Sequence, residues 1–205
     1  MTRRTPYLLA LALAVLAPAA VRGDDEGFVA LFNGKDLSGW VTPDDKALFT
    51  VEDGEIVGRT KGDLKKNEFL VTDKPYGDFV LKAKVKYRDG NSGIQFRSER
   101  KPDGVVSGPQ ADIAAGYWGL LYEERGRGIL ERYPEKEAAK LVREDDWNDM
   151  EIDAKGDHVV IKLNGTKVID RVDPKFKKTG IIALQVHVGK AMEVRFKDIK
   201  IKAAQ

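Results

Sequence analysis

The sequence contains no cysteine and only two histidines among its 205 residues. Without cysteine there is no disulfide framework, no thiolate metal site and no cysteine nucleophile. A chain free of cysteine is compatible with either an oxidising or a reducing compartment. Histidine is the side chain that ordinarily acts as a base near neutral pH. His187 is therefore the candidate base, because His158 lies beside Gly156-Asp157 at a predicted turn, where an exposed loop residue is expected.

The sequence also lacks an apolar run of comfortable membrane-spanning length. The run Tyr7–Ala17 follows Arg3 and Arg4 and precedes small residues at positions 17–20. This order is typical of a secretory signal peptide, and the run is shorter than the roughly 20 residues of a transmembrane helix. We predict a signal peptide at residues 1–23, one domain at residues 24–205, and export to the periplasm or the cell exterior without a stable membrane anchor. An uncleaved anchor is the alternative.

Little net charge remains once the predicted leader is set aside. Residues 1–23 hold three basic and no acidic residues, which leaves 32 basic and 33 acidic residues in the rest of the chain. Proteins that bind nucleic acids carry a basic surface for the phosphate backbone. We therefore expect no nucleic-acid partner.

Helical patterns are scarce, and most of the chain after residue 28 alternates polar and apolar residues with the period of a β-strand. In Phe79–Arg88 the alternation places apolar residues on one face and basic residues on the other. Asp53-Gly54 and Asn164-Gly165 are typical of tight hairpin turns. The predicted strands lie at residues 47–51, 55–59, 79–88, 93–98, 110–114, 149–154, 158–163, 166–171, 180–188 and 192–202.

Many short antiparallel strands without a βαβ rhythm predict an all-β fold, a jelly-roll β-sandwich of two antiparallel sheets. A helix is predicted only at residues 134–142, after a proline. Residues 117–147 form the longest irregular stretch. Long insertions in sandwiches often border a binding site, so we expect this stretch to lie near the ligand.

Three of the predicted strands carry amides and charged groups on their polar face instead of lysines. Alternation pairs Gln95 with Arg97, Gln110 with Asp112, and Gln185 with His187. Such short or planar groups hydrogen-bond in fixed geometries and suit the paired donors and acceptors of sugar hydroxyls. Alternation alone also describes an ordinary solvated sheet face. The composition of the three pairs favours a carbohydrate site.

Aromatic rings and one base complete the candidate site. Trp118 and Tyr122 lie in the irregular stretch, where they would stack on a sugar ring or pack in the core. His187 is the candidate base on the amide face, with Asp112 as its orienting partner or as an acid–base group itself. A histidine that is only hydrogen-bonded is the passive alternative.

Several motifs in a fixed order resemble the 3-keto-disaccharide hydrolase domain family, a group of secreted bacterial proteins. The resemblance covers about residues 28–202. It is carried by LFNGKDLSGW (Leu31–Trp40), NSGIQFRS (Asn91–Ser98), SGPQADI (Ser107–Ile113), GYWGLLYEERGRG (Gly116–Gly128), LNG (Leu163–Gly165), LQVH (Leu184–His187) and MEVRFKDIKIK (Met192–Lys202).

The resemblance implies a concanavalin-like jelly roll that cleaves glycosides oxidised to a ketone at C3. A ketone at C3 acidifies the C2 proton, so a base can remove it, the enolate can expel the leaving group from C1, and water can then add. Such a site needs a base, an oxyanion stabiliser and a proton donor. The roles implied are His187 as base, Asp112 as its partner or a hydroxyl ligand, Arg97 as enolate stabiliser and Glu123 as proton donor.

The remaining candidates hold the sugar. Gln95, Gln110 and Gln185 would bind hydroxyls, and Trp118 and Tyr122 would stack. No cofactor is required by this scheme. A divalent metal bound by Asp112, Glu123 and His187 is an open alternative, since oxygen and imidazole ligands suit several divalent ions.

Two other functions fit the same fold. A carbohydrate-binding, lectin-like module would need the amides and aromatics but no base. An ordinary glycosidase would use a pair of carboxyl groups, and Asp112 with Glu123 would be that pair.

Overall fold

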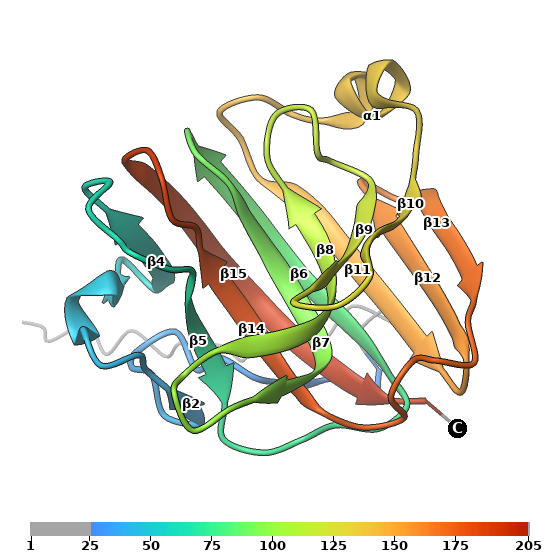
Figure 1. Ribbon diagram of the computed structural model, residues 1–205, viewed down its shortest axis with the longest axis horizontal. Helices are drawn as coiled ribbons and strands as arrows, with labels where there is room; N and C mark the ends of the chain where they lie inside the picture. The colour runs from blue at the N-terminus through green and yellow to red at the C-terminus, as the bar shows by residue number, and fades with distance from the viewer. Residues whose placement is uncertain (1–25, 205) are drawn as a thin grey trace, which may run out of the picture.

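Two antiparallel sheets packed face to face form the protein in the computed structural model, which describes residues 26–204 (Figure 1). The predicted leader at residues 1–23 lies outside the described residues. We name the two sheets the lysine sheet and the amide sheet after the polar side chains on their outward faces. Their strands come from alternating parts of the chain, as expected of a jelly roll.

The lysine sheet has the strand order β13-β12-β11-β6-β15-β4-β3, and β1 also pairs with β15. Its strands are β1 (Val29–Ala30), β3 (Phe49–Glu52), β4 (Glu55–Thr60), β6 (Phe79–Arg88), β11 (Asn148–Lys155), β12 (His158–Leu163), β13 (Thr166–Val172) and β15 (Met192–Ala203).

The amide sheet has the strand order β10-β9-β8-β7-β14-β5-β2. Its strands are β2 (Trp40–Val41), β5 (Glu68–Thr72), β7 (Ser92–Arg100), β8 (Val106–Ile113), β9 (Leu120–Glu124), β10 (Gly128–Arg132) and β14 (Ile181–Val186). A short 3-10 helix (Lys46–Leu48) precedes β3, and helix α1 (Glu135–Leu141) follows β10.

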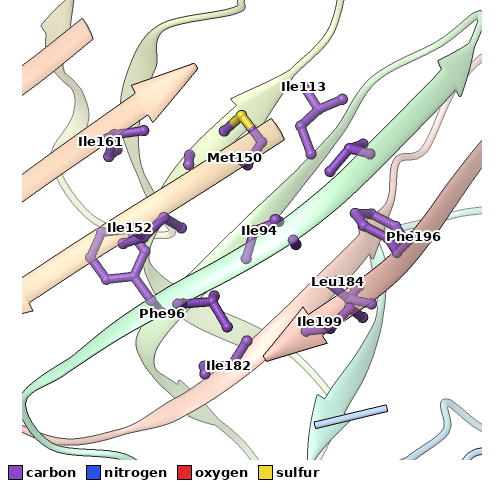
Figure 2. Packing of buried hydrophobic residues seen from close by; sticks show 14 of the residues in the cluster. Ile94, Phe96, Ile113, Met150, Ile152, Ile161, Ile182, Leu184, Phe196 and Ile199 are labelled. Atoms are coloured by element: carbon purple, nitrogen blue, oxygen red, sulfur yellow. The ribbon is translucent and has the colours of Figure 1, made fainter. Parts of the chain in front are cut away.

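The core lies between the sheets because the apolar residues of each strand recur at every second position. Figure 2 shows Ile94, Phe96 and Leu184 of the amide sheet facing Ile152 and Phe196 of the lysine sheet. These side chains are almost completely buried, and burying one of this size contributes roughly 1.5–3 kcal/mol. The same alternation sends the intervening residues of each amide-sheet strand to the outward face, where the candidate site lies.

The all-β prediction with two antiparallel sheets is confirmed, and the single predicted helix is present as α1. Both predicted hairpin turns have positive φ at their two central residues, for example 49° at Asn164 and 83° at Gly165. The prediction that residues 117–147 are irregular was wrong, because they contain β9, β10 and α1. Strand β5 was also missed. Among the described residues, no helix is long and apolar enough to cross a membrane.

Candidate functional site

Four polar side chains meet on the outward face of the amide sheet, and we call them the polar floor: Gln95, Gln110, Asp112 and Gln185. Strand register brings them together, since Gln95 pairs with both Gln110 and Ala183, and Gly93 pairs with Asp112. None of the four is more than 5% exposed. Buried polar groups of this density are unusual on an outward sheet face, because most such groups remain solvated.

The burial of the polar floor arises from the hairpin that joins β7 and β8. Its residue Val106 packs on Phe69, Val71 and Ala183 of the same outward face, and the Lys66 ammonium donates to the Asp103 carbonyl at 2.9 Å. In Figure 1 this hairpin crosses in front of β14. The hairpin thus folds over part of its own sheet and encloses one side of the polar floor.

A glycine provides the space in which the Gln110 side chain lies. A Cβ at position 93 would stand 2.4 Å from the Gln110 Cδ atom, closer than packed atoms can approach. Gly93 therefore lets the Gln110 amide lie flat across β7 toward β14, where its Nε2 donates to Gln185 Oε1 at 3.3 Å.

The polar floor has more hydrogen-bonding capacity than the protein itself uses. Gln110 Nε2 also donates to Asp112 Oδ1 at 2.5 Å. Four buried amide atoms of the polar floor make no hydrogen bond to the described chain: Gln95 Oε1 and Nε2, Gln110 Oε1 and Gln185 Nε2. A buried polar atom without a partner costs about 1–3 kcal/mol. Donors and acceptors held at this cost on one surface indicate a site for a polar ligand.

Asp112 is the titratable member of the polar floor. Its pKa is raised to about 7, chiefly by burial. The hydrogen bond from Gln110 and the charge of Arg132 oppose the rise, and the charge of Glu124 adds to it. The carboxyl group is therefore partly protonated near neutral pH. A carboxyl with a pKa close to the working pH can donate a proton to a leaving group or accept one.

This raised pKa predicts a pH-dependent stability difference for Asp112→Asn. A folded-state pKa of about 7, against an ordinary value of 3.8, means that the native state binds a proton more tightly than the unfolded state. The wild type therefore loses stability as pH rises from 4 to 7, at up to ~1.4 kcal/mol per pH unit. Asparagine has no charge to bury, so the variant gains about 2–4 kcal/mol relative to the wild type between pH 4.5 and pH 8. Urea unfolding at the two pH values measures the change, and a constant difference would contradict the burial of an ionisable Asp112.

His187 follows directly after β14, two residues beyond Gln185 and at the end of the polar floor. It is half-buried. Its backbone N–H donates to the Met192 sulfur at 3.3 Å, and the next residue, Val188, donates its N–H to Asn67 Oδ1 at 2.9 Å. Both contacts fix the backbone that carries the imidazole.

The His187 ring is oriented by its own main chain. Nδ1 lies within hydrogen-bond reach of the Val188 carbonyl oxygen. A carbonyl only accepts, so Nδ1 carries the proton of the neutral ring and Nε2 has the free lone pair. A backbone carbonyl therefore orients this ring, in place of the Asp112 carboxyl group expected from the sequence.

Arg97 does not share the face of Gln95, and this part of the prediction was wrong. Arg97 has a φ of 47°, and the β7–β8 pairing is irregular between Gln95 and Glu99. A bulge of this kind redirects the side chains that follow it. Arg97 is fully buried and donates to Gly77 O, Gly156 O, Ala154 O, Lys177 O and Asp78 Oδ1. Its guanidinium is occupied by these acceptors, away from the polar floor.

Glu123 also lies on the wrong face for the role predicted from the sequence. It alternates with Tyr122 in β9, and Tyr122 pairs with Gln110. Two hydrogen bonds from Arg127, of 2.7 and 2.8 Å, hold its carboxylate and lower its pKa. Glu123 is thus a paired carboxylate rather than a proton donor beside Asp112.

The separation of Glu123 from Asp112 also argues against two alternatives from the sequence, the glycosidase with two carboxyl groups and the divalent metal site. Asp112 and Glu123 do not form the facing carboxyl pair of an ordinary glycosidase. Within residues 26–204, no three histidine or acidic side chains converge as a metal site, so Asp112, Glu123 and His187 do not form the metal set considered from the sequence.

The two predicted stacking residues have different positions. Trp118 belongs to the core and meets Tyr87 edge-on, with ring centroids 6.0 Å apart. The pair lines a cavity of about 300 Å³ beneath α1. Tyr122 is half-buried on the outward face beside Gln110. Of the two rings, only Tyr122 borders the polar floor.

Sequence reasoning missed two charged residues beside the polar floor, Glu124 and Arg132. Glu124 pairs with Gly108, and Arg132 pairs with Leu120. Both act on the pKa of Asp112. The alternation of Tyr122 with Glu124 is the signal that would have located them, once β9 had been recognised as a strand.

Comparison with known proteins gives one family match and several structural likenesses. A family model described as a 3-keto-alpha-glucoside-1,2-lyase-like domain matches residues 27–202. A protein of Parabacteroides distasonis ATCC 8503 with the provisional name glycosyl hydrolase is 26% identical, with a TM-score of 0.68 over 90% of this chain and 98% of its own. No protein with a curated description matches.

Two further likenesses concern the fold alone. The carbohydrate-binding module CBM66 from Bacillus subtilis is 21% identical, with a TM-score of 0.60 over 80% of this chain and 96% of its own. The beta-glucanase of Bacillus licheniformis is 11% identical, with a TM-score of 0.61 over 86% of this chain and 97% of its own. The jelly-roll prediction is confirmed by these folds.

Proposed function

Because the chain belongs to the family of 3-keto-alpha-glucoside-1,2-lyase-like domains, we propose that it is an exported enzyme that cleaves glycosides oxidised to a ketone at C3. The observation that carries the proposal is the polar floor, which combines buried, unpartnered amide atoms with a carboxyl group of raised pKa. His187 follows two residues after Gln185 of this floor. A sugar with many hydroxyls satisfies such atoms, and the acid–base groups serve the cleavage.

The reaction begins with removal of the proton on C2, which the neighbouring ketone makes acidic. The electron pair of the C2–H bond moves into the enolate, and the enolate then expels the C1 leaving group to form a C1=C2 double bond conjugated with the ketone. Water adds at C1 and a proton returns to C2. The sum is hydrolysis of the glycosidic bond, with no change in oxidation state.

His187 supplies the base in this scheme. Its Nδ1–H is directed to the Val188 carbonyl, which leaves the Nε2 lone pair to take the C2 proton. The same nitrogen exchanges its proton with the solvent before water adds and then delivers a proton to C2. A positioned base of this kind contributes typically 10²–10⁴-fold to the rate.

The amides and Asp112 supply the remaining two functions. Gln95 Nε2 and Gln185 Nε2 are donors without a partner among residues 26–204, so they can bind the enolate oxygen that develops at C3. Asp112, which is partly protonated near neutral pH, donates its proton to the leaving oxygen. The amides thus take the role that the sequence suggested for Arg97, and Asp112 takes that of Glu123.

The test compares a 3-keto-glycoside with its unoxidised parent, using the chain without residues 1–23. Release of the leaving group from the keto form alone supports the proposal, since only the ketone acidifies the C2 proton. Equal release from both substrates would contradict it and indicate a direct displacement at C1.

Carbohydrate binding without catalysis is the second candidate. It is favoured by the fold shared with the module CBM66 and by the amides, which need no base to hold hydroxyls. Saturable binding of both sugars without release of the leaving group from either would support this function instead.

A further inference from the structure

The outward face of the amide sheet changes from polar to apolar along a single row of paired residues. From β7 outward the row runs through Gln95, Gln110, Tyr122 and Ile129, each paired with the next. Neighbouring strands lie ~4.8 Å apart, so Ile129 stands roughly 10 Å from Gln110. A ligand that extends along this row leaves the buried amides and meets an aromatic ring, then an aliphatic side chain.

The apolar end of the row is exposed. Ile129 is 55% exposed and Tyr117 is 45% exposed, although both are large hydrophobic residues. Arg132 pairs with Leu120, and its charge acts on the Asp112 carboxyl group. We call Tyr117, Tyr122, Ile129 and Arg132 the rim. Exposed apolar side chains that continue a buried polar site are typical of a ligand-binding groove.

Arg132 contacts the Tyr117 end of the rim. Its guanidinium lies 5.6 Å from the centroid of the Tyr117 ring, within the range of a cation–π contact. Its Nη1 donates to Gly116 O at 3.1 Å. These two contacts hold the Tyr117 ring in place at the edge of the site, even though the ring is exposed to solvent.

We propose that the rim binds the leaving group of the substrate and that this group is an aromatic ring rather than a second sugar. The inference rests on the proposed function, in which the polar floor holds the oxidised sugar. A second sugar would place its hydroxyls against Ile129, which offers no hydrogen bond, and their desolvation would be uncompensated. An aryl group instead packs against Tyr122 and Ile129, which pair across β9 and β10.

The kinetic test pairs two substrates with two variants. The substrates are the 3-keto forms of phenyl glucoside and of a glucose disaccharide. Ile129→Thr keeps the β-branched shape that suits a strand but removes apolar surface. Val172→Thr, at an exposed residue of the lysine sheet, is the matched control. We expect Ile129→Thr to lower kcat/KM about fivefold for the phenyl substrate and to leave the disaccharide unchanged, while the control changes neither.

The experiments distinguish an error in the aryl-binding proposal from an error in the proposed enzymatic function. If the wild type cleaves neither substrate, the proposed function is wrong, and the rim is tested by calorimetric binding of phenyl glucoside against glucose. Phenyl glucoside that binds more tightly than glucose, by a margin lost in Ile129→Thr, supports the rim. Equal losses for both ligands would overturn it. A wild-type dimer that Ile129→Thr dissociates would also overturn it, because the rim would then be covered by a second copy of the chain.

Discussion

Replacing His187 with alanine is expected to lower kcat/KM for a 3-keto-glycoside by about 10²–10⁴-fold, the usual contribution of a positioned general base. The substitution should leave the fold intact, because the imidazole is half-buried and its ring hydrogen bond is to the adjacent Val188 carbonyl. Binding of the unoxidised parent sugar should change little, since the amides that hold it remain.

The matched control for this variant is His158→Ala. His158 lies on β12 of the lysine sheet, where its Nε2 is 2.6 Å from Asp170 Oδ1. Its removal takes away an imidazole without touching the polar floor, so activity should be retained. Steady-state kinetics with a far-UV circular dichroism melt of each variant measures both effects. Equal activity of His187→Ala and the wild type would remove His187 from the reaction.

Replacing Arg97 with methionine is expected to lower the free energy of unfolding by about 3–5 kcal/mol, because the buried guanidinium makes several hydrogen bonds to backbone carbonyls as well as the ion pair with the 38%-exposed Asp78. Arg97 is fully buried, and its Nη2 lies 2.5 Å from Asp78 Oδ1 and 2.8 Å from Ala154 O. Its Nη1 donates to Gly156 O at 2.7 Å. Methionine fills much of the volume but removes these hydrogen bonds, and each buried carbonyl left without a donor adds to the loss. Asp78 Oδ1 keeps one donor, the Gly156 N–H at 3.1 Å.

Arg59→Met is the control for this measurement. Arg59 makes ion pairs with Glu52 and Glu193, but its side chain is 43% exposed. Exposed pairs contribute about 0–1 kcal/mol. Urea unfolding of both variants should therefore separate them by several kcal/mol. A loss at Arg97 no larger than the loss at Arg59 would show that the buried network does not stabilise the connection between the sheets.

The sequence predicted the strands best where the alternation is long and the turns are chemically distinct. Phe79–Arg88 has the same bounds in the sequence prediction and in the structure. The strand prediction failed at residues 120–132 for a physical reason. Strand β9 begins with two consecutive leucines, and the register of β10 against β9 shifts between Ile129 and Glu131. Both features hide the period of two.

The sequence predicted correctly which candidate side chains share one face only where the strands stay regular. The four side chains of the polar floor share one face because the strand pairing around them contains no bulge, so the alternation seen in the sequence holds there. Arg97 lies beyond an irregularity and faces elsewhere. The burial of the amides follows from a hairpin that packs on its own sheet, a tertiary contact that alternation cannot reveal. The raised pKa of Asp112 depends on that burial and was equally beyond the sequence.

Hydrolysis of a 3-keto-glycoside in deuterium oxide, followed by NMR of the released sugar at early times, tests the central claim most directly. His187 removes the C2 proton, exchanges it with the solvent and then delivers a deuteron to C2, so the account predicts deuterium at C2 of the first product molecules. The product incubated with His187→Ala corrects for spontaneous exchange beside the ketone. Sugar released with its original proton at C2 would contradict elimination and indicate direct attack of water at C1.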